Sequence, residues 1–183
     1  MLRDIKQELL DKAMEKIKWS LDKMVTKEKI SKEEADGIYS RITPIVDLNE
    51  AVKDAEMVIE VVPEIMDLKK QVYAELDKAA KPEVIFASNT STLPITEIAN
   101  TTSRPEKFIG IHFFNPPQLM KLVEVIPGEK TSQEITELTQ EFVKSVNKQA
   151  VLCRKDVPGF IINRLFIQWF MKHVIYKIEQ MQL

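Results

Sequence analysis

The sequence predicts an α/β fold, with a mostly parallel sheet that carries helices on both faces and one long C-terminal helix after it. Short apolar segments alternate along the chain with longer segments of helical periodicity, a pattern typical of such sheets. The 183 residues are 44% hydrophobic and 30% charged, which is enough apolar material for a packed core. Apolar residues cover nearly the whole circumference of the last segment, which is unusual for a surface helix.

The first half of the chain is expected to begin with a helix. Ile5, Leu9 and Ala13 start a run of apolar residues at helical spacing, and Asp4 stands at the N-cap position. Ser31 and Glu34 resemble a capping box. In order, we expect helices at 4–26 and 31–40, a strand at 42–46, a short helix at 49–55, a strand at 57–62, a helix at 67–80 and a strand at 84–87.

The second half continues the alternation. We expect strands at 108–113 and 122–126, a helix at 132–146, a strand at 150–152 and a helix from Pro158 onward. A helix that is apolar almost all round must be covered. It packs either against the core of its own domain or, as we prefer, against a second subunit or a further domain.

Composition excludes several functional classes. The net charge of −2 argues against nucleic acid as a partner, because such proteins usually present a basic face. Cys153 is the single cysteine, so neither an intrachain disulfide nor a cysteine-based metal site can form. No secretory signal is evident and the last segment contains too many polar residues to span a membrane. We therefore expect a cytoplasmic protein with no metal and no membrane partner.

Polar side chains stand where three of the expected strands end. Ser88 to Ser91 follow one strand, His112 and Asn115 end another, and Glu60 and Glu64 flank the end of a third. In open α/β sheets, ligands bind beyond the carboxyl ends of the strands. These groups are therefore candidate binding residues.

Glu124 lies inside an otherwise apolar strand, where a carboxylate without a partner is costly to bury. His112 on a neighbouring strand would be a suitable partner. The two form either a general base with its orienting carboxylate or a structural ion pair, and chemistry alone favours neither.

Four motifs occur in order through nearly the whole chain. They are Ser-Asn-Thr-Ser at 88–91, Gly-Ile-His-Phe-Phe-Asn-Pro-Pro at 110–117, Met-Lys-Leu-Val-Glu-Val-Ile at 120–126 and Asp-Val-Pro-Gly-Phe-Ile-Ile-Asn-Arg at 156–164. Together they resemble the L-3-hydroxyacyl-CoA dehydrogenase family, including its 3-hydroxybutyryl-CoA dehydrogenases. The resemblance implies a Rossmann-type NAD-binding domain over residues 1–155, and a helical dimerisation domain of which residues 156–183 are the first helix.

The resemblance also implies residue roles. His112 would take the proton from the substrate 3-hydroxyl, Glu124 would stabilise the imidazolium, Ser91 would bind the substrate hydroxyl and Asn163 would hold the substrate oxygen. The hydride would pass to NAD and leave a 3-ketoacyl-CoA. The implied NAD contacts are Asp4, Glu64, Lys69, Ser91 and Asn115, and the implied coenzyme A contacts are Ser20 and Lys27. The lysines could instead be ordinary surface residues, and Ser20 a neutral helix residue.

One part of the family pattern is absent. The four glycines stand singly, so the chain contains no Gly-x-Gly-x-x-Gly loop to receive a pyrophosphate. Asp4 resembles the acidic residue that binds the ribose after the second strand, which places the first strand, loop and helix before Met1. Its charge favours NAD over NADP. We therefore expect weak NAD binding, a weak or inactive fragment, and sheet neighbours of the first strand that lack a partner.

The main hypothesis is an NAD-dependent 3-hydroxyacyl-CoA dehydrogenase of fatty acid β-oxidation or butanoate-type metabolism. We expect a homodimer or a higher homo-oligomer formed through the helix at 158–183. The alternative is a non-catalytic coenzyme-A-binding or assembly module that has lost dinucleotide binding. Another enzyme of the wider 6-phosphogluconate-dehydrogenase-like group ranks lower, because the 110–117 run favours the hydroxyacyl branch.

Overall fold

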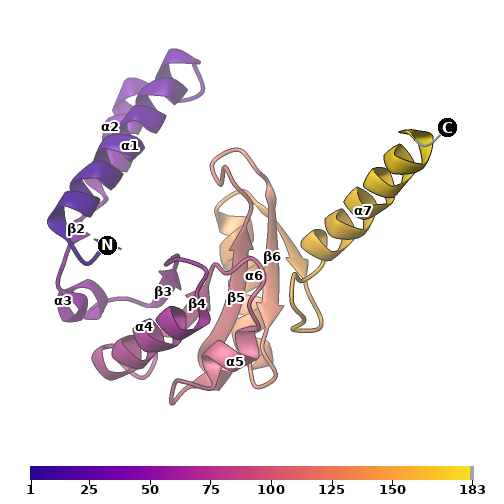
Figure 1. Cartoon of the computed structure of the whole chain (residues 1–183). Coiled ribbons are helices and arrows are strands. Elements are labelled where there is room, and N and C mark those ends of the chain that lie inside the picture. Colours follow the sequence, from indigo (N-terminus) through magenta and orange to yellow (C-terminus); the bar gives the residue numbers. More distant parts are fainter. Residues whose placement is uncertain (182–183) are drawn as a thin grey trace. The chain divides into compact units, whose positions relative to one another are not determined.

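The computed structural model describes residues 1–181 (Figure 1). The chain forms two compact units. One comprises Met1–Ala55 with Ala79–Lys81, and the other comprises Glu56–Lys78 with the residues from Pro82 onward. The first holds a two-stranded sheet and the second a five-stranded sheet. The predicted α/β class is confirmed, but the strands form two sheets where the sequence predicted one.

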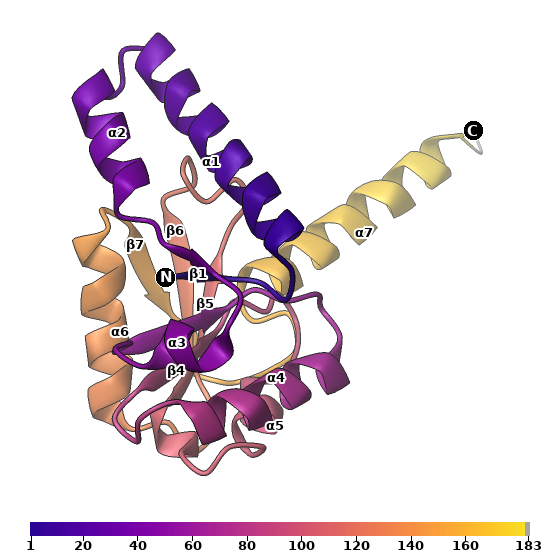
Figure 2. The same cartoon turned by 90° about the vertical axis from the view of Figure 1, so that its left-hand side faces the viewer.

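The first unit is a pair of helices next to a small parallel sheet. Its elements are β1 (Leu2–Arg3), α1 (Gln7–Thr26), α2 (Lys32–Ser40), β2 (Pro44–Ile45) and α3 (Leu48–Val52). β1 and β2 pair in parallel, and α1 and α2 lie side by side (Figure 2). The predicted capping box is confirmed, because the Ser31 hydroxyl accepts from the Glu34 N–H at 3.1 Å and Glu34 Oε2 accepts from the Ser31 N–H at 2.8 Å.

The predicted N-cap of the first helix is wrong. α1 begins at Gln7, and its N-cap is Lys6. The Asp4 carboxylate accepts a hydrogen bond from the neighbouring Ile5 N–H at 2.7 Å. Asp4 therefore stabilises the turn after β1 and not the helix itself.

The second unit is built on the strand order β3-β4-β5-β6-β7. The strands are β3 (Met57–Glu60), β4 (Ile85–Ser88), β5 (Phe108–Phe113), β6 (Leu122–Pro127) and β7 (Gln149–Leu152). Only β5 and β6 pair antiparallel, and the other neighbours are parallel. Among the described residues, the edge strands β1, β2, β3 and β7 each have a neighbour on one side only.

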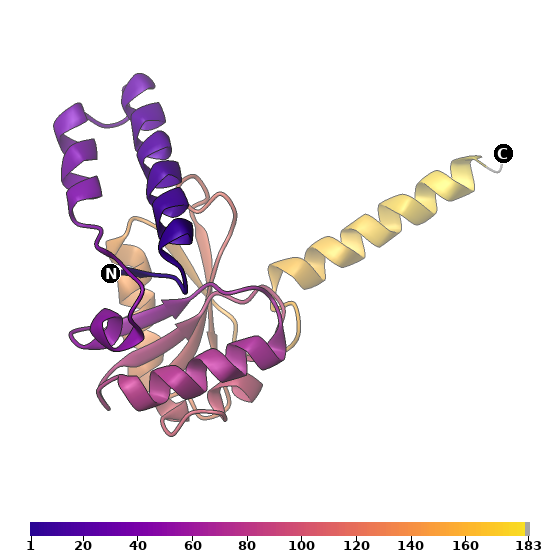
Figure 3. The same cartoon turned by 60° about the vertical axis from the view of Figure 1, so that its left-hand side comes forward.

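Helices cover both faces of the five-stranded sheet (Figure 3). α6 (Gln133–Ser145) packs its Ile135 and Val143 on the alternate strand residues Ile109 and Ile111. The opposite face of β5 carries Phe108, which contacts Tyr73 of α4 (Met66–Ala79) at 4.5 Å between ring centroids. The short helix α5 (Ile95–Ala99) and the 3₁₀ turn η1 (Pro105–Lys107), which sequence periodicity did not predict, lie between β4 and β5 in the chain.

The last helix begins later than predicted. α7 (Ile162–Met181) starts four residues after Pro158, because Gly159 and Phe160 have φ angles of +78° and +50°. These left-handed values cannot continue a right-handed helix.

α7 is also not covered by its own unit. Nine of its large apolar side chains are at least 49% exposed: Leu165, Phe166, Ile167, Trp169, Phe170, Met171, Ile175, Tyr176 and Ile178. The interpretation that this helix packs on its own core is therefore wrong. Among the described residues, no helix is long and apolar enough to cross a membrane.

Candidate active site

The central feature of the site is a buried histidine–carboxylate pair. The antiparallel register of β5 and β6 sets His112 directly opposite Glu124, and His112 Nδ1 lies 2.8 Å from Glu124 Oε2. The side chains are 6% and 0% exposed. The structure thus brings together the two residues that the sequence singled out.

Glu124 is also bonded through its second oxygen. Glu124 Oε1 accepts from the backbone N–H groups of Ile161 and Ile162, each at 2.9 Å. Burial acts to raise the pKa of the Glu124 carboxyl, but the hydrogen bonds from His112, Ile162 and Ile161 outweigh it and hold that pKa below its ordinary value. The carboxylate is therefore ionised at neutral pH.

The ionised carboxylate fixes the roles of the two ring nitrogens of His112. A carboxylate has no proton to donate, so Nδ1 of His112 is the donor in this bond. In the neutral imidazole, Nε2 is then a free acceptor. Nε2 has no hydrogen-bond partner within residues 1–181. This is the arrangement that a general base requires.

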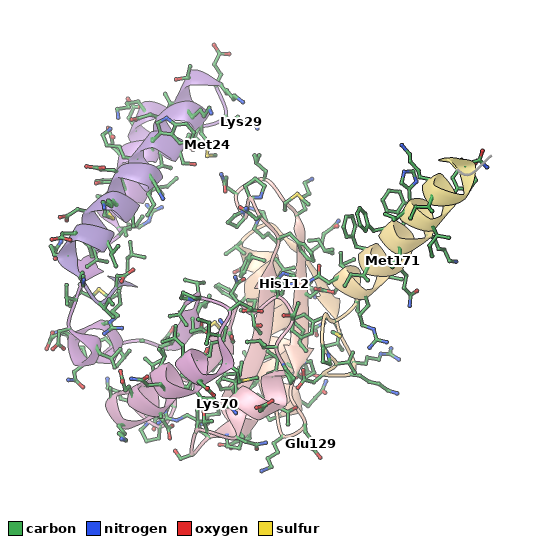
Figure 4. The ribbon with its side chains drawn as sticks, viewed as in Figure 1. Met24, Lys29, Lys70, His112, Glu129 and Met171 are labelled. Carbon is green, nitrogen blue, oxygen red and sulfur yellow. The ribbon has the colours of Figure 1, made fainter. Side chains whose placement is uncertain are left out.

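Two aromatic rings lie against the imidazole. The ring centroid of Phe114 is 4.4 Å from that of His112, and the centroid of Phe160 is 6.0 Å away. Figure 4 shows His112 beside the start of α7. The apolar surroundings strengthen the interaction with Glu124 because they exclude water.

Ser91 lies on a loop that Glu64 holds in place. Glu64 Oε1 accepts from the Thr90 hydroxyl at 2.6 Å and from the N–H groups of Ser91 and Thr92 at 2.9 and 3.1 Å. Burial acts to raise the pKa of Glu64, but these donors and the charge of Lys69 outweigh it, and the pKa is lowered. The Ser91 hydroxyl itself has no partner among the described residues.

Asn163 joins this loop to the start of α7. Its side-chain Nδ2 donates to the Ser91 carbonyl oxygen at 2.9 Å. Because Ile162, the preceding residue, donates to Glu124, the four predicted catalytic residues His112, Glu124, Ser91 and Asn163 belong to one connected cluster. Their roles in catalysis stay predictions.

Lys69 is buried, which sequence reasoning did not predict. Its side chain is 1% exposed, and Nζ donates to Glu60 Oε1 at 2.7 Å and to the Val62 carbonyl at 3.1 Å. Glu64 Oε2 lies 3.5 Å from the same nitrogen. The interpretation of Lys69 as a solvated surface lysine is therefore wrong, since its charge is neutralised inside the unit.

The remaining predicted residues are less constrained. Asn115 is exposed and precedes Pro116 through a cis peptide bond. Asp4, Ser20 and Lys27 belong to the first unit, and Lys27 caps the C-terminus of α1. Within the described chain, no group of three His, Cys, Asp or Glu side chains is placed to hold a metal ion.

Sequence reasoning missed Asp156 as a structural residue of the site. Its carboxylate accepts from the N–H groups of Ile95 and Thr96 at 3.0 and 2.6 Å. It therefore attaches the segment before α7 to the start of α5. The sequence feature that could have revealed this role is the charged residue at the start of the Asp-Val-Pro-Gly turn.

Comparison with known proteins decides the family. The family model "3-hydroxyacyl-CoA dehydrogenase, NAD binding domain" matches residues 1–157. The chain belongs to this family. The family is defined by its NAD-binding domain, and the family resemblance predicted from the four motifs is confirmed.

Two of the similar proteins are named as dehydrogenases. The chain is 42% identical over 166 residues to the 3-hydroxybutyryl-CoA dehydrogenase of Clostridioides difficile, covering 91% of this chain and 58% of that protein. It is 40% identical over 179 residues to the mitochondrial hydroxyacyl-coenzyme A dehydrogenase of Homo sapiens, covering 95% and 57%. The chain thus spans little more than half the length of these two relatives.

Solved structures agree with the fold. The crystal structure of M. tuberculosis FadB2 matches with a TM-score of 0.92 at 32% identity, covering 99% of this chain and 63% of that one. The 3-hydroxybutyryl-CoA dehydrogenase of Escherichia coli K12 matches with a TM-score of 0.85 at 38% identity, covering 89% and 34%. The predicted Rossmann-like fold is confirmed.

Proposed function

We propose that this chain carries the catalytic pair of an NAD-dependent dehydrogenase that oxidises L-3-hydroxyacyl-CoA to 3-ketoacyl-CoA. The observation that supports this most strongly is the buried pair of His112 and Glu124, bonded at 2.8 Å and leaving Nε2 without a partner among the described residues. The Ser91 hydroxyl in the same cluster also has no partner among the described residues. A purely structural ion pair would not account for it.

Each of the four residues has a separate proposed role in the reaction. His112 Nε2 takes the proton of the substrate 3-hydroxyl as that oxygen becomes the ketone oxygen. Glu124 stabilises the imidazolium that forms, and the Ser91 hydroxyl and the Asn163 amide orient the substrate oxygen. NAD, when bound, supplies the acceptor for the hydride that leaves C3 of the substrate. Holding the base and the hydroxyl together removes much of the entropic cost of their encounter.

Part of the chain fits NAD well. Glu64, Ser91 and Asn115 follow β3, β4 and β5 in the chain, and all three are at least partly exposed. The Ser91 hydroxyl has no partner among the described residues, and the Asn115 amide lies on an exposed residue. These groups fit the polar nicotinamide end of NAD. Lys69 fits a direct contact less well because Nζ is already shared by Glu60 and Val62.

The chain fits the pyrophosphate end of NAD poorly. The four glycines stand singly, so the chain offers no glycine-rich loop for the phosphates. Asp4 is proposed to bind the ribose. We therefore propose that the chain by itself binds NAD weakly. This observation favours the alternative function, a coenzyme-A-binding or assembly module without dinucleotide binding.

Ser20 and Lys27 are proposed as coenzyme A contacts, and the ammonium of Lys27 suits a phosphate. We also propose that residues 1–155 form the NAD-binding domain and that residues 156–183 belong to a dimerisation domain. The exposed apolar side chains of α7 support a homodimer or a higher homo-oligomer formed through that helix. Residues 182 and 183 lie outside the described part of the chain. A cytoplasmic location and a role in fatty acid or butanoate metabolism complete the proposal.

The proposal is tested by the oxidation of NADH with acetoacetyl-CoA, the reverse reaction, in wild type and in His112→Ala. Loss of a general base should lower the rate by about 10²–10⁴-fold. Equal rates in the two proteins would defeat the dehydrogenase proposal. Calorimetric titration with NAD tests the alternative, which tight binding would contradict.

A further inference from the structure

The segment that leads into α7, residues 156–163, is bonded to the start of α5, to the Ser91 loop and to Glu124. Asp156 accepts from the Ile95 and Thr96 N–H groups, the Gly159 N–H donates to the Thr92 carbonyl at 3.3 Å, and Asn163 donates to the Ser91 carbonyl. We call this segment the brace. It connects the Ser91 loop to the His112–Glu124 pair.

Phe160 is the residue of the brace with the most unusual backbone. Its φ of +50° follows the φ of +78° at Gly159. A left-handed conformation costs a residue with a Cβ atom free energy that glycine does not lose. The next two N–H groups, of Ile161 and Ile162, both reach Glu124 Oε1 at 2.9 Å. The left-handed pair thus turns the chain so that α7 begins with its first donors on Glu124.

The side chain of Phe160 explains why a large residue occupies such a position. A turn alone would be made at lower cost by glycine or asparagine. The Phe160 ring is fully buried, with the residue 2% exposed, and its centroid lies 6.0 Å from that of His112 at an interplanar angle of 57°. The ring therefore packs near the imidazole whose other neighbour is Phe114, at 4.4 Å.

We propose that Phe160 is a positioning residue for the catalytic pair: its backbone turn aims two N–H groups at Glu124, and its ring restricts the imidazole of His112. Phe160 acts through His112 and Glu124 and touches no reacting atom. The catalytic part of this inference rests on the proposed function. The structural part does not, because the orientation of His112 can be measured without substrate.

The test uses the full chain with ¹⁵N-labelled histidine. The sequence contains two histidines, His112 and His173, and a His173→Gln protein assigns the two signals. In wild type we expect a slowly exchanging Nδ1–H resonance from His112, because that proton is bonded to Glu124 and shielded from water. In Phe160→Gly, where the backbone turn is tolerated and only the ring is lost, we expect that resonance to shift or to disappear by exchange.

Activity provides the second measurement. A small displacement of the base lowers the chemical rate more than binding, so we expect kcat to fall by about ten- to a hundredfold in Phe160→Gly, with little change in KM for acetoacetyl-CoA. Phe160→Leu, which keeps much of the buried volume, should show a smaller change of the same kind. It also serves as the test variant if Phe160→Gly does not fold.

Leu138→Ala is the control. Leu138 is a large apolar residue of α6 that is 43% exposed and belongs neither to the site nor to α7, so its loss should leave the His112 resonance unchanged. The proposal is overturned if the resonance is unchanged in the folded Phe160 variant, or if it moves while a measurable kcat stays the same. If wild type shows the resonance but no activity, the proposed function fails, and the effect on the resonance still decides whether Phe160 positions His112.

Discussion

Two carboxylates organise the site, and they differ in their access to water. Glu124 has a side chain that is 0% exposed and is bonded through both oxygens to His112, Ile161 and Ile162. The side chain of Glu64 is 39% exposed. Its Oε1 receives the hydrogen bonds of the Ser91 loop, whereas Oε2 has Lys69 at 3.5 Å. A carboxylate thus holds His112 in a fixed position where water is excluded, at Glu124, and anchors a loop that is open to solvent, at Glu64.

The largest effect is expected from Glu124→Ala. The variant leaves two N–H groups and the Nδ1–H of His112 without their acceptor in a buried site. We expect the free energy of unfolding to fall by about 3–5 kcal/mol, as for one partner of a buried pair. Urea unfolding followed by circular dichroism measures it. A loss no greater than that of an exposed carboxylate would remove the distinction between the two sites.

Glu64→Gln should have a smaller effect that depends on pH. Because Glu64 is partly exposed, solvent screens its interactions, and we expect a loss of about 1 kcal/mol at neutral pH. The pKa of Glu64 is lowered from 4.5 in the folded chain. Its contribution to stability is therefore fully present above pH 4.5 and is lost as the pH falls through the lowered pKa.

The measurement is urea unfolding of wild type and Glu64→Gln at neutral pH and at several values below pH 4.5. The difference in unfolding free energy between the two proteins should shrink as the pH falls. A difference that grows in acid would show that the Glu64 carboxylate is not the stabilised form.

Asp156→Ala should disturb the two carboxylates least, because Asp156 is bonded to Ile95 and Thr96 and to neither Glu64 nor Glu124. Asp156 bonds the first N–H groups of a short helix, and loss of such a cap costs about 1 kcal/mol. Thermal unfolding measures the stability. Because Asp156 lies at the far end of the brace from Asn163, the His112 resonance should persist, and its loss would mean that the brace acts as one unit.

The sequence predicted which residues meet at the candidate site better than the hydrogen bonds that hold them there. His112 and Glu124 were recognised because a carboxylate inside an apolar strand needs a partner and because their motifs are specific. The bonds from Ile161 and Ile162 to Glu124 were not predicted, since a backbone N–H has no signature in residue type. The capping box at Ser31 was predicted, because its donors and acceptors lie within four residues.

Other differences between the sequence-based predictions and the structure also come from contacts between distant residues or from backbone conformation. Lys69 was not recognised as buried, because its partner Glu60 lies nine residues earlier on another element. The start of α7 was placed too early, because only the structure shows Phe160 in a left-handed conformation. The five-residue α5 is too short for periodicity to detect.

The central claim is that His112 and Glu124 act as one catalytic unit. A double-mutant cycle tests it most directly, with kcat/KM for the acetoacetyl-CoA-dependent oxidation of NADH measured in wild type, His112→Ala, Glu124→Ala and the double variant, under conditions in which all four are folded. If Glu124 acts only through His112, the double variant should be no slower than His112→Ala. Losses that multiply in the double variant would show that the two residues act independently.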